Sequence, residues 1–384
     1  MCCCGILSWC VNCSDLWEPP PGSRGPQGYG AKNSTGDRRI RERKRESNGN
    51  MKITVVIPNY KGKEYIRRCL DSLRAQQEEE PEESQGRMTD WEFSVLVVDN
   101  ASADGSLEIV RQEYPEVKVI ELPENTGFCH AVNVGIRAAD TPYVLLLNND
   151  TEVKPGFIRA LLRRMESDQR IFSVSPLMLS MQDASRVDDA GDRYNALGWA
   201  FARGKGQPAE RYQKPARIFA ACGGASLYRR EAVLSLGGFD ENHFAYLEDI
   251  DIGYRAQIYG WHNVYEPQAK VLHAGSASSG SRYNAFKVSL SSANNAYLIG
   301  KNMPLLQLLL NFPLLLLGFC IKTAFFAKKK MGMLYVKGYA EGIARCFSDA
   351  GKDHKVRFKW RNLGHYCRIQ MTLWLDLVRI FIKS

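Results

Sequence analysis

Residues 51–73 read MKITVVIPNYKGKEYIRRCLDSL, and this stretch holds the pattern that decides the fold. Ile53–Ile57 is a short run rich in β-branched residues that stops at Pro58, which is typical of a buried strand. Apolar side chains then recur on one face of a predicted helix, at Tyr65, Ile66, Cys69, Leu70 and Leu73. A strand followed directly by an amphipathic helix begins a βαβ unit and predicts a parallel sheet.

The same alternation continues as far as residue 165. Further strands are predicted at Phe93–Val98, Val117–Ile120 and Tyr143–Leu147. Further helices are predicted to start near Asp104 and to cover Phe128–Ala139 and Pro155–Met165. Because strands alternate with helices, we expect an α/β fold whose mainly parallel central sheet is covered by helices on both faces.

Polar residues accompany all four predicted strands. They are Pro58, Asn59 and Tyr60 after the first, Asp99 and Asn100 after the second, Asn125 and Gly127 between the third strand and its helix, and Asn148, Asn149 and Asp150 after the fourth. Each cluster alone is equally well explained as a turn, since Asn, Asp and Gly are common turn residues. Sheets of this kind bind ligands beyond the carboxyl ends of their strands, so the four clusters together indicate a ligand site.

The chain lacks the glycine-rich loops that usually hold phosphates in such folds. No G-x-G-x-x-G follows the first predicted strand, and G-x-x-x-x-G-K-[ST] does not occur. A bound diphosphate would therefore need another positive partner. A divalent cation held by Asp150 is the expected one.

A further polar cluster lies in residues 245–254, which read AYLEDIDIGY. Glu248, Asp249 and Asp251 fall in the first turn of a predicted helix, where the helix dipole favours negative charge. A charge-capped helix is the simplest explanation, and Asp251 is expected to pair with Arg255 at i+4. The apolar face of this helix is formed by Leu247, Ile250, Tyr254, Ile258 and Trp261.

The net charge of +9 is unevenly distributed. Residues 301–384 carry 15 basic and 4 acidic side chains, whereas residues 51–300 carry 28 basic and 33 acidic ones. A basic tail can bind nucleic acid or anionic lipid, and the hydrophobic content of this tail favours lipid and no nucleic acid. The cysteines beyond residue 50 show no disulfide spacing, which is typical of a reducing compartment.

Residues 1–50 begin with MCCCGILSWCVNC and continue with Pro/Gly-rich and charged segments, so we expect a disordered extension. Cys10 and Cys13 resemble half of a zinc site, but no second pair of Cys or His lies near enough to complete it. The clustered cysteines are candidates for palmitoylation, whereas Cys2 excludes myristoylation. The apolar run is too short for a secretory signal.

The tail, residues 301–384, contains twenty uncharged residues, Asn302–Ile321, which are enough to span a bilayer. Polar residues and prolines interrupt this stretch, and Lys328–Lys330 follow it closely. Basic segments prefer the cytoplasmic side of a membrane. We therefore expect a re-entrant or surface-lying segment on the cytoplasmic face, with a second interfacial helix at Met371–Ile382. The alternative is that these helices complete the soluble core.

Six segments in residues 51–300 together resemble the inverting nucleotide-sugar glycosyltransferases of family 2, especially the rhamnosyltransferase-like branch. In the order of that family they are VVIPNYKGKEYIRRCLDSL, VVDNASADGS, NTGFCHAVNVGI, LLLNNDT, GGASLYRREAVLSLGGFDE and YLEDIDIGYRAQIYGW. The resemblance implies a GT-A fold for residues 51–300, a dTDP- or UDP-linked donor of rhamnose or another hexose, and Mg²⁺ or Mn²⁺. It also implies a glycan or polyprenyl-linked acceptor in cell-surface polysaccharide synthesis.

The resemblance assigns roles at the donor site. Tyr60 would pack against the nucleotide base, and Asp99 would accept a hydrogen bond from the imide N–H that uracil and thymine share. Asp150 and His273 would hold the cation. The metal motif is often Asp-x-Asp in such enzymes, but it reads Asn148-Asn149-Asp150 here, so an amide replaces the first carboxylate.

The resemblance also assigns the chemical step. Asp249 would act as the base that takes the proton of the acceptor hydroxyl, and Glu248 would bind or orient the acceptor. Gly224 and Ala225, being small, would let the donor sugar or the acceptor approach the backbone, although a tight packed turn explains them equally well.

Two other functions are compatible with an α/β nucleotide-binding fold. A sugar nucleotidyltransferase would carry a glycine-rich loop with Arg or Lys after the first strand, where this chain has PNYKGKEY. A catalytically inactive binding protein of the membrane surface could keep the same fold, but the presence of Asp150 and Asp249 argues against it.

Overall fold

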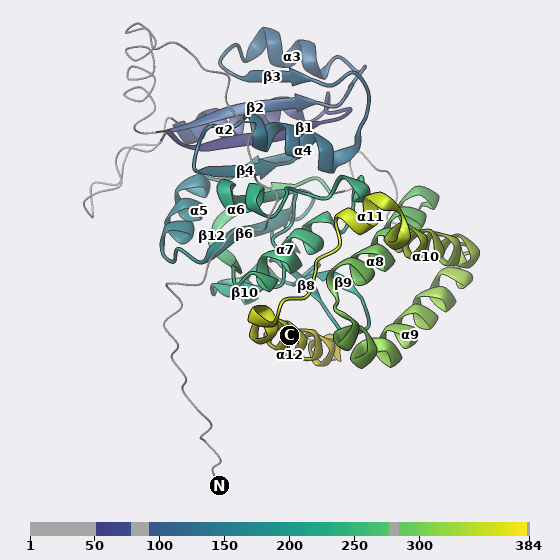
Figure 1. Ribbon diagram of the computed structural model, residues 1–384. Helices are drawn as coiled ribbons and strands as arrows, with labels where there is room; N and C mark the ends of the chain where they lie inside the picture. Colours follow the sequence, from purple (N-terminus) through teal and green to yellow (C-terminus); the bar gives the residue numbers. More distant parts are fainter. Residues whose placement is uncertain (1–50, 78–91, 276–283, 382–384) are drawn as a thin grey trace, which may run out of the picture.

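The computed structural model describes residues 51–77, 92–275 and 284–381 of the chain. The predicted extension, residues 1–50, lies outside this part, as does most of the charged loop after the first helix. The described residues form a central sheet with helices around it, and further helices pack at one end (Figure 1).

The first half of the sheet is parallel, as predicted. Strands β4, β1, β2 and β3 lie side by side in that order and run in one direction. Their carboxyl ends therefore meet at one edge, where Asn59 lies opposite Asp99. The elements of this half are β1 (Met51–Asn59), α2 (Ile66–Gln77), β2 (Glu92–Asp99), α3 (Ser106–Glu113), β3 (Lys118–Glu121), α4 (Gly127–Ala138) and β4 (Tyr143–Leu147).

The second half of the sheet is mixed, so the expected parallel arrangement describes only the first half. Strand β11 (Ala225–Arg229) lies between β4 and β6 (Ile171–Ser180) and is antiparallel to both. Strand β12 (His262–His273) continues the sheet parallel to β6. Because β11 runs against β4, Ala225 lies opposite Leu147, which brings the preceding Gly223–Gly224 to the carboxyl end of β4.

The remaining elements of this half are short. Strand β10 (Ala216–Ile218) closes the sheet on β12, while β5 (Thr151–Val153) pairs with β12 and β7 (Val187–Asp189) with β6. A separate hairpin is formed by β8 (Asp192–Tyr194) and β9 (Ala200–Ala202). The helices are α5 (Phe157–Glu166), α6 (Arg230–Ser235) and α7 (Glu248–Ile258), with single turns at η1 (Ala209–Tyr212) and η2 (Glu241–His243).

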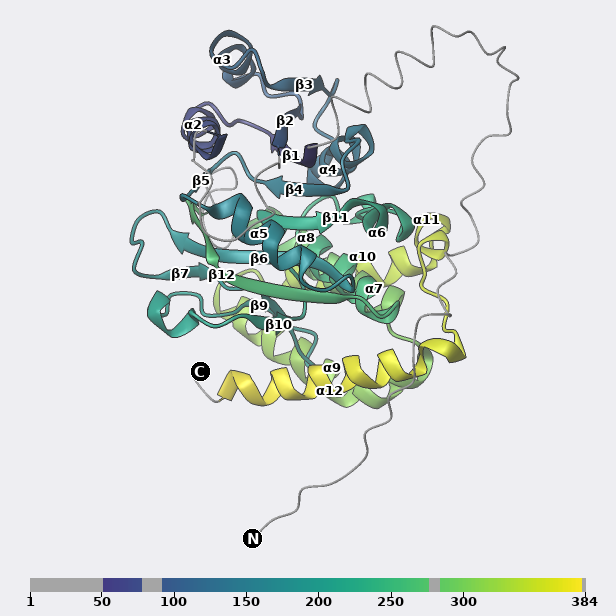
Figure 2. The same cartoon turned by 90° about the vertical axis from the view of Figure 1, so that its left-hand side faces the viewer.

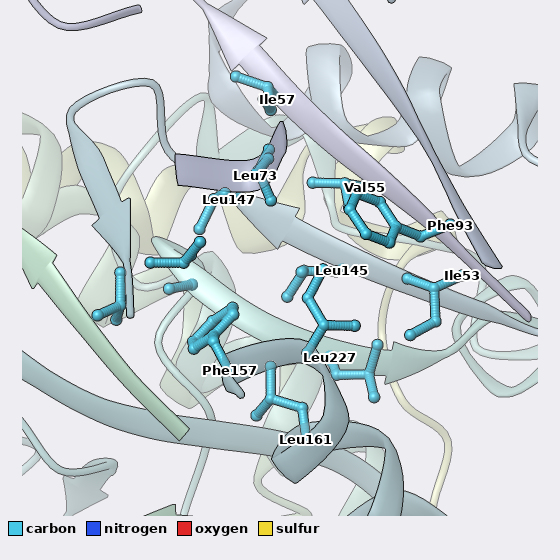
Figure 3. Close-up of a cluster of buried hydrophobic side chains, with 14 of the residues drawn as sticks. Ile53, Val55, Ile57, Leu73, Phe93, Leu145, Leu147, Phe157, Leu161 and Leu227 are labelled. Atoms are coloured by element: carbon cyan, nitrogen blue, oxygen red, sulfur yellow. The ribbon is translucent and has the colours of Figure 1, made fainter. Parts of the chain in front are cut away.

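Helices cover both faces of the sheet (Figure 2). Val55 and Val56 are neighbours in β1, and their side chains point to opposite faces, as the period of a strand requires. Val55 belongs to a core with α2, α3 and α5, which includes Leu73 and Phe157 (Figure 3). Val56 belongs to a second core with α4, α6 and α7. These two cores hold the strand ends in a fixed arrangement.

The helices from α8 onward, which are called the tail from here, begin before residue 301. Of these, α8, α9 and α12 pack against the end of the molecule formed by α7 and β8 (Figure 1). Ile250 and Tyr254 of α7 share a third core with Leu315 and Leu373 of the tail. The domain boundary predicted at residue 300 falls inside α8. One helix therefore spans this boundary. The tail elements are α8 (Ala285–Asn302), α9 (Leu305–Lys328), α10 (Gly332–Phe347), α11 (Asp349–Asp353), η3 (Trp360–Asn362) and α12 (Leu363–Phe381).

Only one face of α9 is packed. Gln307, Asn311, Leu315 and Gly318 are buried, whereas the leucines on the other face are exposed. Among the described residues, α9 is the one helix whose length and composition would allow it to cross a membrane, and 22% of its most apolar window is buried. The inner face of α9 therefore completes the core, as the alternative expected. Its outer face does not.

Candidate active site

A cavity of about 700 Å³ opens at the carboxyl ends of β1, β2 and β4. It collects most of the residues that the sequence predicted for donor binding, namely Pro58, Asn59, Tyr60, Asn100, Asn125, Gly127, Asn148, Asn149 and Asp150. These residues come from four separate loops, and the parallel half of the sheet brings them together. The structure thus places the predicted polar clusters around one cavity.

Buried amides connect the strands below this cavity. Asn149 Nδ2 donates to Asn59 Oδ1 at 2.7 Å, and Asn59 Nδ2 donates to Asp99 Oδ1 at 2.7 Å. Asp99 Oδ2 accepts from the Ser102 amide at 3.0 Å. Both carboxylate oxygens of Asp99 therefore accept hydrogen bonds within the protein, and Asp99 is not among the residues that line the cavity. The predicted contact with a nucleotide base would need a side chain that reaches the cavity.

The turn before α4 is shaped by Asn100 and Gly127. Asn100 Nδ2 donates to Asn125 Oδ1 at 3.0 Å and to the Gly127 carbonyl at 3.1 Å. Gly127 has φ +86°, and an added Cβ there would lie 2.5 Å from the Phe244 ring. Glycine is required at this position by both its backbone conformation and its close contact.

Asp150 and His273 meet beside the cavity. His273 Nε2 lies 3.4 Å from Asp150 Oδ1, and His273 Nδ1 lies 2.7 Å from Asp188 Oδ2. Burial alone would lower the pKa of His273, but hydrogen bonds to Asp150 and Asp188 outweigh it and raise the pKa to about 10. Imidazole and carboxylate are suitable ligands for one divalent cation, and a carboxylate on Nδ1 leaves Nε2 to bind it. The donor set therefore fits the predicted cation.

Asp249 approaches the same end of the sheet from α7. Its Oδ1 accepts from the Ile250 amide at 2.7 Å, and its Oδ2 lies 3.5 Å from the Gly223 amide. The next residue, Gly224, accepts a hydrogen bond from the Asn148 amide at 2.8 Å through its carbonyl. The segment Gly223–Gly224 therefore contacts both the predicted base and Asn148 of the metal motif.

The small residues beside Asp249 serve packing. An added Cβ on Gly224 would lie 3.2 Å from Asn148 Nδ2, and Gly224 itself is buried. Ala225 is fully buried in the core, so the predicted contact between Ala225 and a sugar is wrong. The reason is that Ala225 already belongs to β11, whose side chains here point into the core.

The three acids of α7 lie in different environments. Burial raises the pKa of Asp249, and burial together with the Asp249 charge raises the pKa of Glu248 to about 8. For Glu248, desolvation therefore outweighs the stabilisation of negative charge by the helix dipole. Burial alone would raise the pKa of Asp251, but Arg255 and Lys301 hold it well below its usual range. The predicted pair is confirmed, with Arg255 2.8 Å from Asp251.

Two sequence comparisons concern the α/β body of the chain. The profile of Glycosyl transferase family 2 matches residues 54–237. The N-acetylglucosaminyl-diphospho-decaprenol L-rhamnosyltransferase of Mycobacterium tuberculosis is 33% identical over 251 residues, which cover 59% of this chain and 78% of that protein. The chain belongs to glycosyltransferase family 2. Its predicted activity class is confirmed, and the alternative of a sugar nucleotidyltransferase is set aside.

Further comparisons agree with the assignment of this chain to glycosyltransferase family 2. Rhamnosyltransferase WbbL of Escherichia coli K12 is 25% identical over 235 residues, which cover 58% of this chain and 83% of that protein. Staphylococcus aureus TarS 1–349 in complex with UDP-GlcNAc superposes with a TM-score of 0.51 at 17% identity, covering 76% of this chain and 82% of that one. GalNAc-T7 with UDP, GalNAc and Mn²⁺ superposes equally well at 17% identity, although this chain spans only 48% of it. The shared fold confirms the GT-A prediction.

Two parts of the candidate site in this family 2 enzyme were not predicted from the sequence. Asp188, which holds His273, lies in the stretch Val187–Asp192 (VDDAGD), whose three aspartates in six residues were a visible signal. The second part is the aromatic side of the cavity, formed by Phe128, Phe244, Tyr246 and Phe286. No periodic pattern marks these rings, because they come from separate segments.

Proposed function

We propose that this glycosyltransferase is a metal-dependent inverting enzyme that transfers rhamnose or another hexose from a dTDP- or UDP-linked donor to a lipid-linked glycan. The observation that carries the proposal is the convergence of Asp150, His273 and Asp249 at one end of the sheet. Asp249 reaches this end through Gly223, and Asp150 reaches it through the loop after β4. A cation ligand and a base are the two groups that such a transfer needs.

In the proposed reaction, the acceptor oxygen attacks the anomeric carbon on the face opposite the nucleotide. The new carbon–oxygen bond forms as the bond to the diphosphate breaks, which inverts the configuration. Asp249 takes the hydroxyl proton onto its carboxylate. A base works best when its pKa is near the working pH, and the raised pKa of Asp249 supports this assignment.

Asp150 and His273 would hold a Mg²⁺ or Mn²⁺ ion, which when bound would neutralise the charge of the departing diphosphate. Asp188 fixes the His273 ring by accepting from Nδ1, so that Nε2 points toward Asp150. The amide at Asn148 adds no charge to this site, so the ion would rely on Asp150 and the diphosphate for negative charge.

The donor and acceptor follow from the relatives. Two relatives are named as rhamnosyltransferases, and the mycobacterial one is named for an acceptor with a diphospho-decaprenol lipid. We therefore assign a deoxyhexose donor and an N-acetylglucosaminyl-diphospho-lipid as the first acceptor to test. Tyr60 lies on the cavity wall after β1, where it can pack against the base of the donor.

The exposed apolar side chains and the positive charge of the tail agree with a lipid-linked acceptor. Helices α9 and α12 lie together at the end of the molecule opposite α3 in both views (Figures 1 and 2). Their outer faces expose large apolar side chains, among them Leu305, Leu306, Leu309, Leu316, Leu317, Met371, Leu375 and Val378. The tail also carries a large excess of basic residues, which anionic lipids attract. We propose that the enzyme docks peripherally on the cytoplasmic face of a membrane.

The test is transfer by the purified full chain. A panel of dTDP-, UDP- and GDP-sugars is incubated with Mn²⁺ and a short-chain N-acetylglucosaminyl-diphospho-lipid, and the released nucleoside diphosphate is measured. We expect turnover with a dTDP- or UDP-sugar, loss of turnover in EDTA, and a product with inverted anomeric configuration by NMR. Nucleotide binding without turnover for every donor would refute the proposal.

A further inference from the structure

One side of the cavity is aromatic and has no role in the proposed donor contacts. Phe244, Tyr246 and Phe286 all line it. The ring of Phe286 lies 6.3 Å from that of Phe244 and 6.5 Å from that of Tyr246, in edge-on arrangements. Phe286 is 56% exposed although it is a large apolar residue. Two segments distant in sequence therefore present a group of rings toward one space.

The backbone that carries two of these rings is strained. Phe244, Tyr246 and Leu247 have φ values of 58°, 69° and 67°, in the left-handed region that residues with a Cβ rarely adopt. Such conformations persist only where the surrounding structure holds them, and they cluster at ligand sites. Three of them in four residues, beside a cavity, point to a loop shaped for binding.

The structure that holds this loop comes from the tail. Asn294 of α8 is fully buried, and its Nδ2 lies 2.8 Å from the His243 and Ala245 carbonyls and 2.9 Å from that of Tyr246. Arg345 of α10 donates to Asn294 Oδ1 at 2.9 Å. Helices α8 and α10 therefore hold the loop that carries Phe244 and Tyr246, and α8 itself carries Phe286.

The position of the rings indicates what they bind. The strained loop leads directly into Glu248 and Asp249, the acids that face the acceptor in the proposed reaction. Tyr60 and Asn100, proposed for the nucleotide, follow β1 and β2 instead. A pyranose ring has a face of C–H groups that packs on aromatic rings, and pockets for such ligands combine aromatic walls with a few polar groups.

We infer that Phe244, Tyr246 and Phe286 form the platform on which the sugar ring of the acceptor rests before its hydroxyl meets Asp249. The inference rests on the proposed function, because it takes Asp249 as the base. It adds a binding site for the acceptor sugar, as distinct from the nucleotide, the donor sugar and the lipid.

The experiment compares Phe286→Ala with Phe286→Tyr in the full chain. Phe286 is exposed, so its truncation leaves the core intact, and tyrosine keeps the ring. Initial rates are measured with the N-acetylglucosaminyl-diphospho-lipid at saturating donor, and then with the donor varied. We expect Phe286→Ala to raise the KM for the lipid roughly 10-fold with the donor KM within about twofold, and Phe286→Tyr to match the wild type.

A second readout separates the inference from the function it rests on. Hydrolysis of the donor without any acceptor is measured in Phe286→Ala and wild type, because it reports on the donor site alone. An active enzyme whose KM for the lipid is unchanged by Phe286→Ala would overturn the platform alone. A donor KM that rises with the acceptor KM would assign the rings to the donor and also overturn it. A wild type that turns over no donor would refute the proposed function itself.

Discussion

At the residue scale, two adjacent carboxylates at the start of α7 differ in what surrounds them. Asp249 accepts from the Ile250 amide, whereas Glu248 Oε2 is buried with no hydrogen-bond partner among the described residues. With a pKa of about 8, Glu248 is mainly protonated at neutral pH. Neighbouring groups whose environments separate their pKa values take different parts in acid–base chemistry.

Neutral isosteres at the two positions should therefore give different results. Asp249→Asn removes the base and is expected to lower kcat by about 10²- to 10⁴-fold while nucleotide affinity stays close to wild type. Glu248→Gln copies the protonated acid and should keep transfer within about tenfold at pH 7. The measurements are kcat and nucleotide Kd. Equal loss in both variants would contradict the assignment of Asp249 alone as the base.

Glu248 should also make stability depend on pH. Its folded pKa of about 8 lies above the ordinary value of 4.5, so the folded state binds the proton more tightly than the unfolded state. The stabilisation of the folded state by this proton is complete below pH 4.5 and is lost as the pH rises toward 8. In urea unfolding, the free energy of unfolding of Glu248→Gln relative to that of the wild type should increase as the pH rises across that range. A difference that stays constant with pH would show that Glu248 is ionised in the folded protein.

Asp188 is expected to act through His273. Asp188→Asn weakens the hydrogen bond that orients the ring and should lower Mn²⁺ affinity by about 10- to 100-fold. Titration of Mn²⁺ followed by electron paramagnetic resonance measures it. The matched control is Asp183→Asn, an exposed aspartate nearby that pairs with Arg186 and should leave affinity unchanged. Unaltered affinity in Asp188→Asn would remove His273 from the proposed metal site.

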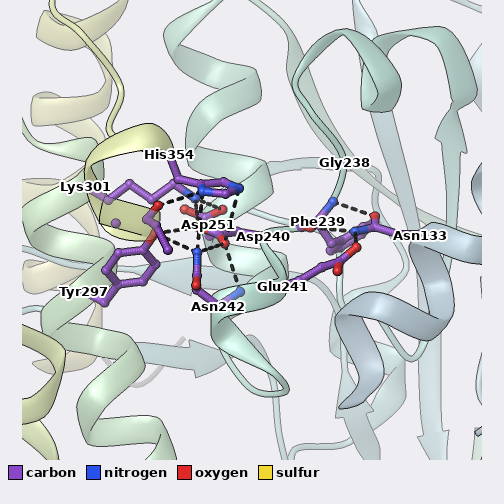
Figure 4. A network of polar contacts seen from close by, with 12 residues as sticks. Asn133, Gly238, Phe239, Asp240, Glu241, Asn242, Asp251, Tyr297, Lys301 and His354 are labelled. Carbon is purple, nitrogen blue, oxygen red and sulfur yellow. Dashed lines mark hydrogen bonds and ion pairs between the residues drawn. The ribbon is translucent and has the colours of Figure 1, made fainter. Parts of the chain in front are cut away.

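At the element scale, α8 is joined to α7 by buried charges (Figure 4). Lys301 Nζ lies 2.6 Å from Asp240 Oδ2 and 2.9 Å from Asp251 Oδ2, and all three side chains are almost completely buried. Asn302 also donates to Asp251 at 2.8 Å. The last turn of α8 therefore neutralises an acid of the catalytic helix, which explains why α8 cannot be divided at residue 300.

Breaking this network should be costly. Lys301→Met fills the same space but leaves Asp240 buried without the ammonium group and Asp251 with Arg255 alone, which is expected to destabilise the protein by about 3–5 kcal/mol. Chemical unfolding measures the change. Lys352→Met is the control, because the pair of Lys352 with Asp349 is exposed and its loss should have little effect. Similar stability of both variants would mean that the carboxylates become protonated at little cost.

At the scale of the whole molecule, the chain has a catalytic end and an apolar end. The cavity opens at the carboxyl ends of the strands, and α9 and α12 expose their outer faces at the end farthest from α3 (Figure 2). Large exposed apolar surfaces mark sites that contact a membrane or another protein. The inner faces of both helices share a core with α7 and β8, so the apolar end and the end with the cavity belong to one packed unit.

Membrane binding should depend on the outer face of α9. Leu309, Leu316 and Leu317 are at least half exposed, and changing all three to glutamine should lower binding to anionic vesicles on the order of 100-fold. Cosedimentation with vesicles of phosphatidylglycerol and phosphatidylcholine measures it. Methionine at the same positions keeps the apolar surface and should keep binding. Full binding by the glutamine variant would place the membrane contact elsewhere.

Much of the fold was predictable because each element of its first half is marked by a short-range pattern in the sequence. The strands β1 to β4 and helices α2 to α5 lie close to the predicted ranges, since each is marked by its own periodicity. The antiparallel insertion of β11 was not predicted, because pairing partners along a sheet are set by contacts between distant segments. The same insertion decides that Gly224 adjoins Asn148.

By itself, the amino-acid sequence determined the family, the parallel half of the sheet and the acids and amides that gather at its carboxyl edge. Each of these depends on short-range patterns of polarity and size. Only the tertiary structure decided that Asp188 supports His273, that Glu248 holds a proton near neutral pH and that Asn294 shapes the aromatic loop. These properties arise from desolvation and from contacts between residues far apart in the chain, which no local pattern records.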